Sequence, residues 1–119
     1  MLWLFRKKSP TQKALSRLQR QCRTAQTSDL IGAGLVIDVL HSSFIKEFGS
    51  ISDFCNRSRS EQDGYMSRLA KLQGHGKTKL GADLMGLWVI AAQIDDVDTQ
   101  CKAAEVMALL SRQANGVKP

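Results

Sequence analysis

Proline is nearly absent from this sequence. The only two prolines, Pro10 and Pro119, lie near the two ends of the chain. Because proline removes a backbone hydrogen bond and clashes with the preceding turn, its absence from the interior leaves long helices uninterrupted. The pattern of a half-buried strand, a sustained alternation of polar and apolar residues rich in β-branched side chains, is also missing. These two absences predict an all-α fold.

Cysteine and histidine are also scarce, and their spacing excludes several kinds of site. The three cysteines, Cys22, Cys55 and Cys101, are scattered and odd in number. Isolated cysteines beside apolar residues are typical of reduced thiols, so we expect a cytoplasmic protein without a disulfide framework. No two cysteines have the spacing of zinc ligands, and His41 and His75 lie far apart in the sequence. We therefore predict no metal site.

Two short motifs suggest chemistry, and both are incomplete. The glycines and lysine of residues 74–78 resemble the end of a phosphate-binding loop, but Lys71 stands where that loop has its first glycine. The three carboxylates of residues 95–98 are followed by none of the ligands that a calcium loop requires, and they suit the first turn of a helix. We therefore predict no enzyme activity, no catalytic residue, no cofactor and no small-molecule substrate.

Acidic residues are missing from the first part of the chain. Residues 1–28 carry seven basic side chains and no acid, so the formal net charge of +6 is distributed unevenly. Residues 57–79 form a second basic cluster, whereas residues 29–56 and 80–119 are net acidic. A local excess of cations predicts contact with an anionic partner, or a solvated basic surface.

The first helix has a clear beginning. Ser9, Pro10 and Gln12 have the pattern of an N-cap, a first helical position and a capping box, and the helix is expected to run to about Gln26. At 100° per residue its apolar side chains gather on one side and its cations on the other. Together with the cations that precede it, this basic side is our predicted polyanion-binding site: Arg6, Lys7, Lys8, Lys13, Arg17, Arg20 and Arg23.

An apolar segment precedes these cations. Leu2, Trp3, Leu4 and Phe5 followed by basic residues have the composition of an interfacial membrane anchor, and equally of a segment that docks on protein. Four residues bury too little area for stable membrane residence, and no apolar run approaches the ~20 residues of a spanning helix. We therefore favour docking on a protein, with Leu2, Trp3 and Phe5 as partner-binding residues.

The rest of the chain predicts further helices. One runs from Thr27 to a stop at Gly49, another follows Ser50 and is broken at Gly64, and residues 79–93 form a helix that is apolar nearly all round and belongs in the centre. A final helix spans residues 95–113. We expect a compact bundle of four to five helices in residues 9–115, between an arm at 1–8 and a tail at 116–119.

The final helix has two apolar stripes, and a core needs only one of them. Val97, Cys101 and Ala108 belong to the first stripe. We expect the second stripe to remain available for self-association or for a partner, and its residues are Ala103, Val106, Met107 and Leu110.

These features predict a non-enzymatic α-helical protein–protein interaction module, a small accessory or adaptor subunit of a larger assembly. The first alternative is a nucleic-acid-binding protein that contacts the phosphate backbone through basic helix faces. Base-specific binding is disfavoured because Tyr65 is the only aromatic residue in the second basic cluster. The second alternative is peripheral association with an anionic membrane through the N-terminal arm.

Overall fold

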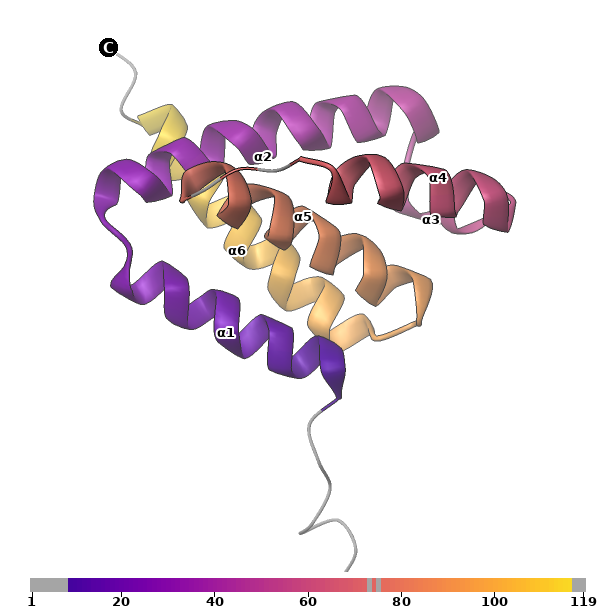
Figure 1. The fold of residues 1–119 in the computed structure, drawn as a ribbon, viewed down its shortest axis with the longest axis horizontal. Coiled ribbons are helices and arrows are strands. Elements are labelled where there is room, and N and C mark those ends of the chain that lie inside the picture. Colours follow the sequence, from indigo (N-terminus) through magenta and orange to yellow (C-terminus); the bar gives the residue numbers. More distant parts are fainter. Residues whose placement is uncertain (1–8, 73, 75, 117–119) are drawn as a thin grey trace, which may run out of the picture.

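Helices make up almost all of the described part of the chain. The computed structural model describes residues 9–72, 74 and 76–116, and within them it contains helices and no strands (Figure 1). The all-α prediction is confirmed, although the described residues form six helices instead of four or five. In chain order these are α1 (Pro10–Thr24), α2 (Thr27–Phe48), α3 (Ile51–Cys55), α4 (Arg59–Ala70), α5 (Lys77–Gln93) and α6 (Val97–Gly116).

Local hydrogen bonds explain where α1 begins and ends. The Ser9 side chain accepts from the backbone N–H of Gln12 at 3.2 Å, and the Gln12 side chain accepts from the backbone N–H of Ser9 at 3.1 Å. This is the predicted capping box. The helix ends at Thr24, two residues earlier than expected, because the backbone of Ala25 is extended. A connection of only two residues therefore joins α1 to α2.

The break between α3 and α4 does not lie at Gly64, so that prediction was wrong. Residues 56–58 separate the two helices, and the Ser58 side chain caps α4 by accepting from the backbone N–H of Glu61 at 3.2 Å. The Gln62 side-chain amide donates to the carbonyl oxygens of Phe54 and Cys55 at 3.1 and 3.0 Å. A glycine inside a helix weakens it without ending it, whereas a serine cap with an acidic first turn starts a new one.

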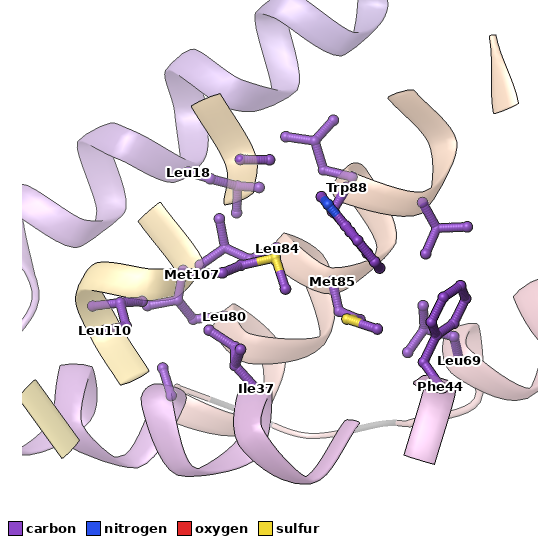
Figure 2. Packing of buried hydrophobic residues seen from close by; sticks show 14 of the residues in the cluster. Leu18, Ile37, Phe44, Leu69, Leu80, Leu84, Met85, Trp88, Met107 and Leu110 are labelled. Atoms are coloured by element: carbon purple, nitrogen blue, oxygen red, sulfur yellow. The ribbon is translucent and has the colours of Figure 1, made fainter. Parts of the chain in front are cut away.

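Helix α5 is the centre of the bundle, as predicted. It packs against each of the other five helices, and its side chains fill the core shown in Figure 2. One end of the core is aliphatic and the other is an aromatic cluster, in which Phe44, Phe48, Phe54 and Tyr65 meet at centroid distances of 4.8–5.6 Å. Burial raises the pKa of Tyr65 to about 12, so this hydroxyl stays neutral and serves the packing.

Helix α6 uses the stripe that we expected to be free. Ala103, Met107 and Leu110 are buried against the rest of the bundle, so the prediction that they form a partner surface was wrong. Val106 is half-buried, and Val97, at the start of the other stripe, is 63% exposed. The reason lies in α2, where a Cβ at Gly34 would stand within 3 Å of the Leu110 backbone. Because α2 and α6 approach so closely at Gly34, the side of α6 that carries Leu110 must face α2.

By length and composition alone, α2 is the one described helix that is long and apolar enough to cross a membrane. Helix α2 contains both the apolar run around Leu35 and the apolar and aromatic residues near its C-terminal end, and it is therefore longer than that run. A long core helix meets the same criteria. In the structure α2 packs against α3, α5 and α6, and Ile37, Phe44 and Phe48 are buried in the core.

Replacement of two helical glycines by alanine is expected to have opposite effects. Gly34→Ala should lower the free energy of unfolding by about 2 kcal/mol, because the new methyl group overlaps the backbone of α6. Gly64→Ala should raise it by ~0.5–1 kcal/mol, because no atom lies within 4 Å of the new Cβ and alanine is the better helix former. Urea unfolding of both variants measures this, and a stable Gly34→Ala protein would contradict the close packing.

Truncation of buried side chains of α5 should be far more damaging than truncation of an exposed one. Leu87→Ala and Trp88→Ala are each expected to cost roughly 2–5 kcal/mol, because both side chains are buried. Ile90→Ala should cost about 1 kcal/mol or less, because Ile90 is 40% exposed. Thermal melts would disprove this arrangement if all three variants unfolded at similar temperatures.

Candidate functional site

The predicted binding residues are distributed over several regions. Leu2, Trp3, Phe5, Arg6, Lys7 and Lys8 lie outside the described residues. Lys13, Arg17, Arg20 and Arg23 all belong to α1, and all four are exposed. The described part of the predicted polyanion-binding site is therefore the outer side of α1.

Helix α1 is held on the bundle by its apolar side and by one polar contact. Leu15 and Leu18 are buried against α5 and α6. At the start of the helix, the buried Thr11 hydroxyl donates to Asp96 Oδ2 at 2.6 Å. Asp96 Oδ1 also accepts from the backbone N–H of Thr99 at 3.2 Å, so this carboxylate caps α6 and anchors α1. The hydrogen bond from Thr11, followed by those from Thr99, lowers the pKa of Asp96 below its ordinary value.

None of the four cations of α1 has an acidic partner among the described residues. Five ion pairs occur among the described residues, and all of them use bases outside α1: Arg57–Glu61, Arg59–Asp63, Arg68–Glu47, Lys79–Asp83 and Lys102–Asp98. The second basic cluster is thereby largely neutralised. Helix α1 contains no acid, so its outer side carries an uncompensated positive charge.

An open groove lies beside this charged helix. Its volume is about 380 Å³, its floor is α5, and its walls are α1 and α4. From α1 it is lined by Ala14, Arg17 and Leu18, and from α4 by Met66, Leu69 and Ala70. Arg17 thus stands on the rim of a mostly apolar groove.

The floor of the groove is one continuous stripe of α5. The stripe consists of Lys79, Ala82, Asp83, Gly86, Leu87 and Ile90. This spacing of three and four residues follows one side of a helix over about 16 Å, or three turns. At its centre Gly86 has room to spare, because a Cβ there would meet only the end of Leu69, at 3.7 Å. The absence of a side chain at Gly86 therefore leaves space in which the backbone of another helix can approach the floor.

A second apolar surface, with a volume of about 380 Å³, lies on the opposite side of α1. Cys22, Arg23, Val106 and Leu109 line a hollow between α1 and α6, and Leu109 is 49% exposed. Two members of the predicted α6 stripe, Val106 and the buried Leu110, line this hollow. Burial raises the pKa of the Cys22 thiol, which keeps it protonated and unreactive. Arg17 and Arg23 consequently border different hollows, although the helical projection placed them together.

Two carboxylates of the acidic motif at residues 95–98 make contacts that stabilise the start of α6. Asp96 caps α6, and Asp98 pairs with Lys102 at 3.1 Å. Among the described residues, no three His, Cys, Asp or Glu side chains gather closely enough to hold a metal ion.

The groove residues of α4 and α5 were not identified from the sequence. The available signal was the apolar composition of α5 on every side, because a helix in a small bundle cannot bury its whole circumference. Comparison of the chain with known protein families, with curated proteins and with solved structures found no match. The groove and the charge of α1 are therefore the observations that support a functional proposal.

The contact between Thr11 and Asp96 should make stability depend on pH. A carboxyl group with a lowered pKa stabilises the fold above its unfolded pKa of about 3.9, and this contribution disappears as the pH falls through the folded value. We expect Asp96→Asn to melt below the wild type at pH 7, and the difference to shrink at about pH 2.5.

Asp95→Asn is the matched control, because Asp95 has a φ of +58° and asparagine tolerates that conformation. Its melting temperature should stay close to that of the wild type at both pH values. A constant difference between Asp96→Asn and the wild type across the pH range would contradict the role of the Asp96 charge.

Proposed function

We propose that this protein is a non-enzymatic protein-interaction module, an adaptor within a larger assembly. In this proposal the groove between α1 and α4 binds an amphipathic helix of the partner, with acidic residues along the flank that faces α1. The observation that carries the proposal is an open groove whose floor is a three-turn stripe of α5, beside cations of α1 that have no acidic partner.

The shape of the groove favours a helix as its ligand. An amphipathic helix presents apolar side chains at three- and four-residue spacing, and the α5 stripe has the same spacing and a length of about 16 Å. Ala82 and Gly86 at the centre of the floor permit close approach of the two backbones. Ile90, which is 40% exposed, provides apolar contact at one end of the floor. Burial of Ile90 and of the apolar side chains of the partner helix would contribute to the binding free energy.

The charge beside the groove favours an acidic partner. Arg17 lines the groove, and Lys13 and Arg20 lie one turn before and after it on α1. Lys79, near the other end of the floor, is already paired with Asp83 at 3.3 Å. The free positive charge is thus confined to the α1 wall. Complementary charges orient a partner and speed its association, while salt weakens their effect.

Nucleic acid is the second candidate ligand, and the four exposed cations of α1 support it. A phosphate backbone would use those cations and would leave the apolar floor of the groove without a partner. The two candidates therefore differ in their dependence on Ile90 and in their response to salt, because each phosphate contact adds to the salt dependence of affinity.

Two synthetic peptides test the proposal. Each is an amphipathic helix of about fourteen residues, roughly four turns, with the same leucine face and with either glutamate or lysine on its flanks. We expect the protein to bind the glutamate peptide and to reject the lysine peptide in fluorescence anisotropy. Arg17→Glu should weaken binding by about tenfold, equivalent to ~1.4 kcal/mol, and Ile90→Ala by several-fold.

Arg112→Glu is the matched control, because Arg112 is an exposed arginine of α6 that does not line the groove. Its affinity for the glutamate peptide should remain within about twofold of the wild type. Equal binding of the two peptides, or binding of neither, would contradict the proposal. Binding of duplex DNA that falls steeply with salt, needs Arg17 and ignores Ile90 would support the nucleic-acid alternative instead.

A further inference from the structure

A separate cleft lies between α2 and α6, away from the groove. Its volume is about 520 Å³, and it shares no lining residue with the groove. Its floor is apolar and is formed by Ile37, Trp88 and Met107, which Figure 2 shows in the core between the helices. A volume of this size lies within the usual range of small-molecule sites, roughly 300–1,000 Å³.

The charged group of this cleft is a fixed carboxylate. Asp38 is half-buried on α2, and its Oδ1 accepts from the Ser111 hydroxyl at 2.5 Å. Its Oδ2 accepts from the Asn115 side-chain amide at 3.2 Å, and that amide is itself held by the Ser111 carbonyl oxygen at 2.9 Å. These contacts set the orientation of the carboxylate in advance, which reduces the entropy lost when a ligand binds.

The charge of Asp38 is not neutralised within the described residues. Its two donors are neutral, none of the ion pairs described above includes it, and no lysine or arginine lines the cleft. The chain has a net charge of +6 and seventeen basic residues, yet the one formally charged side chain that lines this cleft is acidic. A half-buried carboxylate gains most from a cationic partner, because charges interact more strongly away from bulk water.

Two aromatic rings stand beside the carboxylate. The rings of His41 and Trp88 pack with their centroids 5.4 Å apart, and Trp88 is supported from the core by Phe44 at 5.3 Å. The indole is therefore rigid. Rigid aromatic and aliphatic surface next to a carboxylate suits a ligand that has an apolar stem and a positive end.

We infer that this cleft binds a small organic cation, an ammonium or guanidinium group on a short apolar stem. The positive group pairs with Asp38, and the stem lies on the floor formed by Ile37, Trp88 and Met107. A divalent metal ion fits less well, because it needs several oxygen or nitrogen ligands and Asp38 is the single carboxylate of the cleft. The inference is independent of the proposed adaptor function, because the groove and the cleft are formed by different residues.

Butylammonium and butylguanidinium are the probes, with butanol and butyrate as the neutral and anionic controls. The readout is the NMR resonance of the Trp88 indole N–H, recorded in a Trp3→Phe background at constant ionic strength. We expect both cations to shift this resonance in a saturable way, and the two controls to leave it unchanged.

Asp38→Asn should weaken binding of both cations by at least about tenfold, because asparagine can still accept from Ser111 but carries no charge. Asp98→Asn is the matched control, an exposed acid outside the cleft, and it should bind as the wild type does. Ala108→Leu places a larger side chain of α6 in the cleft and leaves the charge of Asp38 unchanged. This variant should also weaken binding of the cations. This second variant tests the site even if the Asp38 variant folds poorly.

Three results would overturn the inference. The first is the absence of a saturable shift with either cation. The second is an equal shift with butanol, which would indicate an apolar hollow without charge selection. The third is unchanged affinity in both Asp38→Asn and Ala108→Leu.

Discussion

The close approach of α2 to α6 at Gly34 is the contact on which the rest of the structure depends. A Cβ at this position would overlap the Leu110 carbonyl oxygen and lie 2.9 Å from the Ala114 side chain. The two helices cross here and separate toward the start of α6 (Figure 1). The crossing turns Leu110 and Met107 inward, and the widening gap beyond it holds Trp88 and opens the cleft that contains Asp38.

The groove also depends on this crossing, because α5, which forms the floor of the groove, packs against the two crossing helices. This helix buries one side against α2 and α6, and Gly81 allows that contact, because a Cβ there would lie 2.8 Å from Val36. The remaining side of α5 is covered by α1 and α4, which bury Ala82 and Leu87 and leave Ile90 exposed. The two helices do not meet over α5, and the groove is the space between them.

The sequence predicts the local features of this fold well and its side-to-side packing poorly. Ser9 with Gln12, and Gly49 with Ser50, define helix ends through hydrogen bonds and backbone angles of neighbouring residues, so their effect does not depend on the rest of the chain. The choice between the two stripes of α6 depends on Gly34, more than sixty residues away in the sequence.

The candidate sites follow the same distinction. The cations of α1 were visible in the sequence because they are close together on one helix, and the structure leaves them exposed. The cleft combines Asp38, Trp88 and Ser111 from three helices, and no spacing along the chain relates them. Sites assembled by tertiary contact leave no periodic pattern, and the same holds for the α4 wall of the groove.

The Gln62 side chain ties one wall of the groove to its floor. Its amide binds carbonyl oxygens of the preceding helix, and its oxygen accepts from Gln93 at the end of α5 at 3.2 Å, so α4 is tied to the floor at that end. Helix α1 is held by two buried leucines and the hydrogen bond of Thr11. Both walls of the groove are therefore fixed by side-chain hydrogen bonds at the same end of its floor, where α5 is followed by α6.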